Sequence, residues 1–209
     1  MSSRRFRGVL FSGLVLAALE LSACGSSGPP PKLYVLGDTA QAGAGDVSQL
    51  SDPVVELKPV RIPDYLDTMD ILTRQAGGHI VASESARWGE RLSVGVTRAI
   101  AMSLDTRLPH VAITTSPSLE EPRWQILIDI DAFETQAEGQ CVLTGRWSIW
   151  KGRGREKLNE ERISLATQVG KESDAEVVAA MTRQVDQLAG RIALALETRM
   201  PSASNAKAE

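Results

Sequence analysis

The sequence predicts an α+β fold, a mainly antiparallel sheet with two amphipathic helices packed on one face. Apolar and polar residues alternate through residues 124–165, which is typical of strands. Two other segments, 88–108 and 174–196, repeat apolar residues every three or four positions, as amphipathic helices do. Strands followed by a helix, then strands and a second helix, are typical of an α+β domain.

Short strands are expected first in the chain. Residues 33–36 and 54–60 are rich in valine and leucine, and the polar, glycine-rich residues 37–52 between them are expected to form a loop. Pro59 limits the pairing of the second strand near its end. Residues 61–66 then turn the chain.

A hairpin and a helix follow this turn. Two extended segments, 70–74 and 79–82, flank Gly77-Gly78, a pair that favours a tight turn. We expect the helix to begin at Trp88 with Ser85 as its N-cap, and Pro109 to end it.

The second half predicts a meander and a closing helix. Strands are expected at 124–131, 141–150 and 158–165, with a basic turn at 151–155 between the last two. Residues 173–176 (Ser-Asp-Ala-Glu) form a capping box, and the helix that follows carries one apolar face as far as Leu196.

The first 23 residues have the features of a lipoprotein signal peptide. Three arginines lie within the first seven residues, and the apolar residues 9–19 are too few to span a bilayer, which needs roughly 20. Residues 21–24 (Leu-Ser-Ala-Cys) resemble the lipobox that lipoprotein signal peptidase cleaves. We therefore expect residues 1–23 to be removed and the Cys24 thiol to be acylated, anchoring the protein in a membrane.

A spacer separates this cysteine from the predicted domain. Residues 24–32 contain glycine and serine and then three prolines, a composition that suits a flexible tether. Gly25 stands where an aspartate retains lipoproteins in the inner membrane of enteric bacteria, so we expect lipid anchoring on the periplasmic face of the outer membrane. Residues 33–199 are then the domain, and 200–209 are a polar C-terminal tail.

Composition narrows the possible partners and bonds. The chain has 23 Lys and Arg against 26 Asp and Glu, and removal of the signal peptide leaves a net charge of about −5, which argues against a nucleic-acid partner. Once Cys24 is acylated, Cys141 is the only thiol and no intramolecular disulfide is expected. Hydrophobic packing must therefore hold the domain together.

The sequence offers no constellation for catalysis. His79 and His110 have no Cys, Asp or Glu at a metal-ligand spacing, so we expect neither a metal nor a cofactor. A nucleophile elbow, a phosphate loop and a dinucleotide fingerprint are also missing from the sequence. We therefore expect a protein that is not an enzyme.

Three features allow a functional and a structural interpretation. Asp129 and Asp131 lie on the same side of a strand, an arrangement also found for catalytic carboxylates, but alternation explains them as a solvated face. Cys141 is either reactive or buried, and its register with Leu143 favours burial. The basic turn at 151–155 suits lipid head groups, an acidic partner or only solvent, and we favour solvent.

Several segments match one family in the same order. They are Tyr34-Val35-Leu36, Val60–Asp67, Ile71–Arg74, Arg87–Leu92, Phe133-Glu134, Leu143-x-Gly145-Arg146-Trp147, and the closing helix with Leu188-Ala189 and Ile192. Together they resemble the paraquat-inducible protein C (PqiC) lipoproteins, the ABC-type transport auxiliary lipoprotein component domain. The Ile-Pro-Asp-Tyr-Leu stretch at 62–66 is the most specific part.

The resemblance implies a non-catalytic accessory subunit of an MCE-type (Pqi-like) lipid transport system between the inner and outer membranes, contributing to membrane integrity. Its partner would be an MCE-domain membrane protein, and because MCE assemblies are rings, the lipoprotein is a possible homo-oligomer. An outer-membrane scaffold or assembly lipoprotein not tied to a transporter remains the alternative.

The same resemblance suggests residues for a partner surface or its support. They are Arg61, Pro63, Tyr65, Leu66, Arg74, Trp88 and Leu92. Two of them, Tyr65 and Trp88, are equally compatible with the core. We expect replacement of Tyr65 and Leu66 together by alanine to weaken partner capture and to leave thermal stability nearly unchanged.

Overall fold

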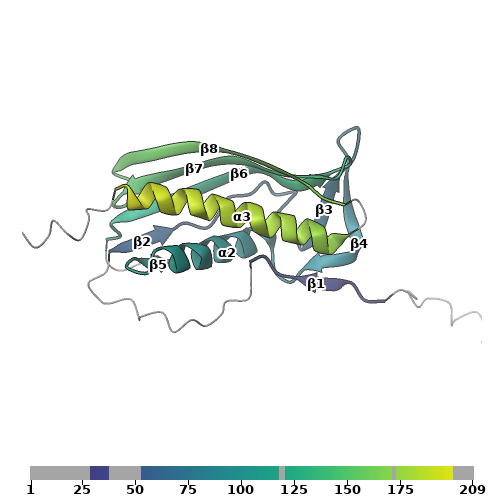
Figure 1. Cartoon of the computed structure of the whole chain (residues 1–209), viewed down its shortest axis with the longest axis horizontal. Coiled ribbons are helices and arrows are strands. Elements are labelled where there is room, and N and C mark those ends of the chain that lie inside the picture. Colours follow the sequence, from purple (N-terminus) through teal and green to yellow (C-terminus); the bar gives the residue numbers. More distant parts are fainter. Residues whose placement is uncertain (1–28, 38–52, 118–120, 171–172, 200–209) are drawn as a thin grey trace, which may run out of the picture. The chain divides into compact units, whose positions relative to one another are not determined.

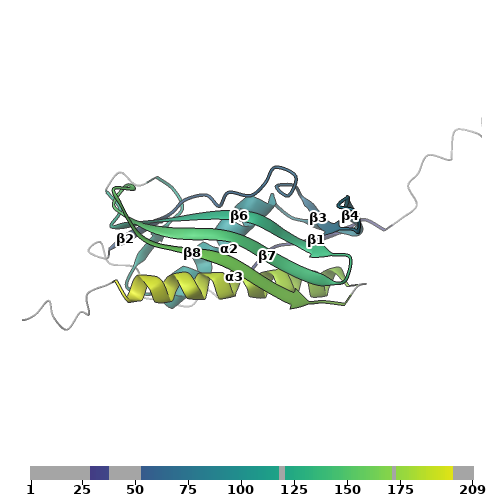
Figure 2. The ribbon, with the colours of Figure 1, turned by 90° about the horizontal axis from the view of Figure 1, so that it is seen from above.

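The computed structural model describes residues 29–37, 53–117, 121–170 and 173–199. Contacts divide the chain into residues 1–30 and residues 31–209, and all of the described helices and strands lie in the second unit. Within that unit, α2 (Leu92–Arg107) and α3 (Asp174–Glu197) lie on one face of a single sheet (Figures 1 and 2).

The sheet contains eight strands among the described residues. They are β1 (Lys32–Tyr34), β2 (Val54–Leu57), β3 (Asp70–Arg74), β4 (Ile80–Trp88), β5 (Ala112–Thr114), β6 (Trp124–Gln136), β7 (Gln140–Lys151) and β8 (Glu156–Gln168). Strand β6 is central, because β7 pairs along one of its edges while β2 and β3 pair with opposite ends of the other.

The predicted α+β class is confirmed, but the sheet is mixed rather than mainly antiparallel. Among the described strands, four pairings are parallel and three are antiparallel. One antiparallel ladder joins β3 to β4, and two more join β6 to β7 and β7 to β8. Short turns connect the two strands of each of these pairs. The other strands are separated by longer connections, including α2 between β4 and β5, and such crossovers return the chain in parallel.

The predicted start of the first helix is wrong. Ser85 and Trp88 belong to β4, and α2 begins at Leu92. Backbone pairing prevails over the helical spacing here, because the Trp88 amide donates to the Met69 carbonyl at 2.7 Å and the Gly89 amide donates to the Tyr34 carbonyl at 2.7 Å. The predicted end is confirmed, since α2 stops at Arg107, just before Pro109.

The other predicted elements appear with shifted bounds. The hairpin around Gly77-Gly78 is confirmed, and the three strands of the meander are longer than predicted. The strand predicted over 54–60 ends at Leu57, and the Val60 amide instead donates to Thr97 Oγ1 in α2 at 2.9 Å. Residues 1–28, 38–52 and 200–209, with Cys24 and most of the predicted tether and loop, lie outside the described residues.

The capping box at the start of α3 is confirmed in part, because Ser173 Oγ accepts from the Glu176 amide at 3.3 Å.

The core lies between the two helices and the inner face of the sheet. Gln184 of α3 is fully buried in this layer and donates to the Cys141 carbonyl at 3.0 Å and to Thr167 Oγ1 at 3.1 Å. These bonds fix α3 against β7 and β8.

A bulge in β6 changes which side chains face this core. Pairing with β7 shifts between Ile130 and Ala132, so that Asp131 is an extra residue. Before the bulge Ile130 faces inward, and after it Phe133 does so and is only 1% exposed. Glu134 therefore lies on the outer face, away from the helices. Opposite the bulge stands Gly145, where a Cβ atom would lie 2.2 Å from the Asp129 carbonyl oxygen.

We predict that Gly145→Ala destabilises the fold by about 3 kcal/mol, because the added methyl overlaps the backbone of β6. Gly190→Ala in α3 is the matched control, since its Cβ would meet only the Arg107 guanidinium at 3.8 Å. That helical substitution should stabilise by roughly 0.5–1 kcal/mol. Urea unfolding measures both, and equal effects at the two positions would contradict the close approach of β7 to β6.

Candidate functional site

The segment between β2 and β3 runs along the edge of β6. The Arg61 amide donates to the Ile128 carbonyl at 3.0 Å, and the Arg61 carbonyl accepts from the Ile130 amide at 2.8 Å. Pro63 then begins a turn in which the Leu66 amide donates to the Pro63 carbonyl at 2.9 Å. The turn places Tyr65 at the surface and Leu66 in the core.

Three outer-face residues of β6 each bind a side chain from β2, from β3 or from the segment between them. Gln125 Nε2 donates to Glu56 Oε2 at 2.6 Å, Asp129 accepts from Arg61 Nε, and Glu134 accepts from Arg74 Nε. Burial alone would raise the pKa of Glu56, but hydrogen bonds from Lys58 and Gln125 lower it. The outer face is thus an ordered polar surface.

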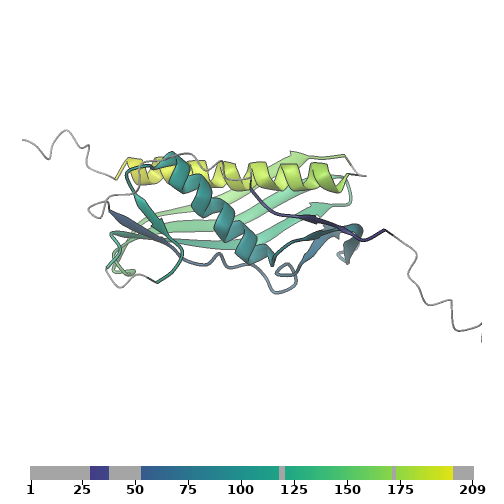
Figure 3. The same ribbon diagram turned by 90° about the horizontal axis from the view of Figure 1, so that it is seen from below.

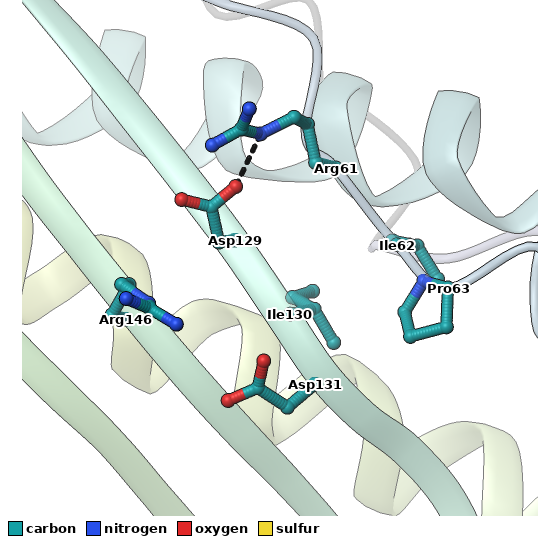
Figure 4. A pocket seen from close by; sticks show the side chains of 7 residues that line it. All are labelled: Arg61, Ile62, Pro63, Asp129, Ile130, Asp131 and Arg146. Atoms are coloured by element: carbon teal, nitrogen blue, oxygen red, sulfur yellow. Dashed lines mark hydrogen bonds and ion pairs between the residues drawn. The ribbon is translucent and has the colours of Figure 1, made fainter.

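A depression of about 360 Å³ lies at the middle of this surface (Figure 4). Arg61 reaches Asp129 across it, while Asp131 from β6 and Arg146 from β7 also line it. Asp131 and Arg146 are exposed and have no hydrogen bond or ion pair with any described residue. Both charges are therefore free to pair with groups on another molecule.

The best-ordered part of the site is the cluster of Tyr65, Arg74 and Glu134. Arg74 donates through Nε to Glu134 and through Nη2 to the Tyr65 hydroxyl at 2.8 Å. Its guanidinium also lies 5.4 Å from the Tyr65 ring centroid. Glu134 is only 2% exposed, and within the described residues its Oε2 atom has no hydrogen-bond partner. Arg74 is therefore the main compensation for a buried carboxylate.

Electrostatics keep Arg74 charged and Tyr65 neutral. The hydrogen bond to Glu134 raises the pKa of Arg74, and partial burial together with the Glu134 charge raises the pKa of Tyr65. The cluster thus presents a fixed cation beside a phenol that keeps its proton.

The structure divides the residues predicted for a partner surface into two groups. Arg61, Pro63, Tyr65 and Arg74 come together on the outer face, where Tyr65 is 40% exposed. The remaining three, Leu66, Trp88 and Leu92, are at most 3% exposed and pack in the core. Because Leu66 is buried, its replacement should destabilise the protein, contrary to the expectation that replacing Tyr65 and Leu66 together leaves thermal stability nearly unchanged.

Sequence reasoning missed Glu134 and Arg146 as members of the site. The signal for Glu134 was a change of spacing: apolar residues stand two apart up to Ile130 and three apart from Ile130 to Phe133. That change marks a bulge and moves Glu134 to the outer face. Arg146 could be placed on this face from the alternation in β7 alone.

Other candidate features lie on ordinary surface. His79 and His110 are exposed, and the described residues contain no cluster of three or more potential metal ligands among His, Cys, Asp and Glu. In the basic turn, Arg155 pairs with Glu121 at 2.9 Å. None of the described helices is both long and apolar enough to cross a membrane.

Comparison with known proteins identifies the family. A family model described as ABC-type transport auxiliary lipoprotein component matches residues 34–193. The chain belongs to this family. The match runs from the last residue of β1 through most of α3, and confirms the resemblance to PqiC-type lipoproteins found in the sequence. By its family, the chain is therefore an envelope lipoprotein.

Two crystal structures share the fold. One, of an uncharacterised protein, has a TM-score of 0.66 at 17% identity and covers 80% of this chain and 99% of its own. The other, a Xanthomonas campestris protein of the family DUF330, has a TM-score of 0.59 at 15% identity and covers 81% and 96%. No curated protein matches the sequence.

We predict that Arg74→Met destabilises the protein by about 3 kcal/mol, because it leaves the Glu134 carboxylate buried and unpaired. Adding Glu134→Gln should restore part of that stability, since the neutral amide removes the unpaired charge. A double-mutant cycle by urea unfolding measures the coupling. Strictly additive effects would contradict the importance of the pair.

Cys141 should be inert in the folded protein. The side chain is fully buried, and burial raises the pKa of its thiol to about 12. Relative to the ordinary value of 9.0, this lowers the thiolate fraction at pH 7.5 by a factor of about a thousand. Labelling by a thiol reagent should therefore be slow in buffer and fast in urea. Rapid native labelling would show that Cys141 is accessible.

Proposed function

We propose that this lipoprotein is a non-catalytic docking subunit of an MCE-type, Pqi-like lipid transport system that connects the inner and outer membranes. The family match over residues 34–193 carries the proposal. In this role the protein supplies a binding surface and an anchor, and it contributes to membrane integrity by keeping the transporter in place. The partner would be an MCE-domain membrane protein.

The outer face of the sheet has the properties of such a binding surface. Both helices cover the inner face, and the outer face of β6, β7 and β8 is not covered by a described helix (Figure 2). Its charges are held in place by Arg61–Asp129 and Arg74–Glu134. Fixed side chains lose little conformational entropy on binding, which favours affinity without any rearrangement.

Tyr65 and Arg61 are the strongest candidates for direct contact. Tyrosine and arginine are enriched at the positions that contribute most to protein interfaces. Tyr65 is partly exposed beside Arg74, and Arg61 is 74% exposed beside the unpaired Asp131. A partner with complementary charges would pair with Asp131 and Arg146 and cover the Tyr65 ring.

The outer membrane is the location that fits this role. Gly25 follows the expected lipidated Cys24, which is compatible with export from the inner membrane. An anchor there raises the local concentration of the domain at the receiving end of a conduit. Ring-shaped MCE proteins would also favour several copies of the lipoprotein at one conduit.

Purification of the lipidated protein at native expression levels, under mild detergent, tests the proposal. Mass spectrometry should find an MCE-domain protein in stoichiometric amount. Reproducible recovery of other outer-membrane or cell-wall components without an MCE protein would reject the proposal, and would favour a scaffold lipoprotein instead.

Substitutions on the outer face should reduce this capture. We predict that Tyr65→Ala and Arg61→Ala each weaken partner binding about tenfold or more, because each removes a central contact. The surface ion pair of Arg61 contributes at most about 1 kcal/mol, so the melting temperature should change little. Arg191→Ala, at an exposed position of α3, is the control that should bind normally. Unchanged capture by both outer-face variants would exclude this surface.

A further inference from the structure

Large apolar side chains are exposed around the junction between β4 and α2. Leu33 is 67% exposed, Val35 51%, Met69 44% and Val94 51%. Seven large apolar side chains are exposed within the described residues, and these four are the majority. Single exposed apolar residues are ordinary, but a group of them marks an interaction site. We name these four residues the junction patch.

Backbone hydrogen bonds join the segments that carry these residues. At the end of β4, the Gly89 amide donates to the Tyr34 carbonyl of β1, and the Trp88 amide donates to the Met69 carbonyl. The first residue of α2, Leu92, donates its amide to the Thr68 carbonyl at 3.2 Å. A Cβ atom on Gly89 would lie 3.2 Å from Val35 Cγ2. Leu33 and Val35 thus border the junction on the β1 side, and Met69 borders it on the other.

The expected lipid anchor lies close to this patch along the chain. Strand β1 begins at Lys32, eight residues after Cys24. Even a fully extended chain spans at most about 3.6 Å per residue, so β1 lies within roughly 30 Å of the lipidated cysteine. The C-terminal end of α3 lies at the end of the folded unit opposite β1 (Figures 1 and 3). A lipidated Cys24 would therefore keep the junction patch within reach of the bilayer surface.

Two arginines beside the junction patch form ion pairs with carboxylates. Arg87 pairs with Asp70 at 2.9 Å, and Arg91 pairs with Asp67 at 2.6 Å, while both arginines stay at least half exposed. Arginine stems cover apolar surface while their charged heads remain in a polar layer. Because each arginine already has a carboxylate, the two arginines add little attraction to anionic lipid. Apolar burial, which salt does not screen, is the available driving force.

We propose that the junction patch inserts into the boundary between head groups and acyl chains of the phospholipid bilayer that holds the lipid anchor. The domain then rests on the membrane in a defined orientation. This inference rests on the proposed function only through the acylated Cys24. It assigns a lipid contact to residues outside the outer-face site.

Environment-sensitive fluorophores test the insertion. Leu33→Cys and Met69→Cys would each be labelled in the lipidated protein and reconstituted into phosphatidylcholine vesicles that contain a spin-labelled lipid quencher. Leu194→Cys is the matched control, because Leu194 is 63% exposed and lies near the end of α3. The buried Cys141 does not compete for the label. We expect at least about twofold stronger quenching at residues 33 and 69 than at 194, unchanged in 1 M salt.

Equal quenching at all three positions would overturn the proposal. The fluorophores at residues 33 and 69 could instead report an apolar environment that disappears when the protein is diluted tenfold in lipid. That result would identify a second copy of this chain as what covers the patch, and would also overturn the proposal. Failure of the protein to float with vesicles would reject both the anchor and the patch. Partner capture, measured on the same preparations, separates this inference from the proposed function: lost capture with intact quenching rejects only the docking role.

Discussion

The single extra residue in β6 is the constraint on which both faces of the sheet depend. With Asp131 as a bulge, Ile130 and Phe133 both enter the core, although three positions separate them. An uninterrupted strand would send Phe133 to solvent and Glu134 into the apolar layer beneath the helices. Burying that carboxylate without a cation would cost several kcal/mol. Gly145 permits the bulge, because only a residue without a side chain lets β7 approach β6 so closely.

The same bulge creates the most specific part of the outer face. It aligns Glu134 with Arg74 from β3, and Arg74 in turn fixes the Tyr65 hydroxyl. A buried ion pair adds little net stability compared with apolar packing, but it allows only one arrangement of its members. The cluster therefore defines a surface of fixed shape.

Local pattern predicted the class of the fold and most of its elements, because alternation and helical spacing depend on nearby residues. It could not predict the parallel pairings, which depend on contacts between distant segments such as β3 and β6. It also misplaced the start of α2. Trp88 and Leu92 have helical spacing and are both buried, but one is buried in a strand and the other in a helix. Replacement of Leu66 was expected to leave thermal stability nearly unchanged, but the turn folds back and buries this side chain in the core.

The turn from Pro63 to Met69 connects the two proposed contact surfaces. Tyr65 near its start is bound to Arg74, and Asp67 near its end accepts from the Ser93 amide at 3.0 Å and from Arg91. Burial would raise the pKa of Asp67, but these bonds lower it, so its charge persists. A turn held at both ends transmits orientation. If Met69 rests in lipid, the direction in which Tyr65 faces a partner is fixed relative to the membrane, and the partner meets the lipoprotein at a single angle.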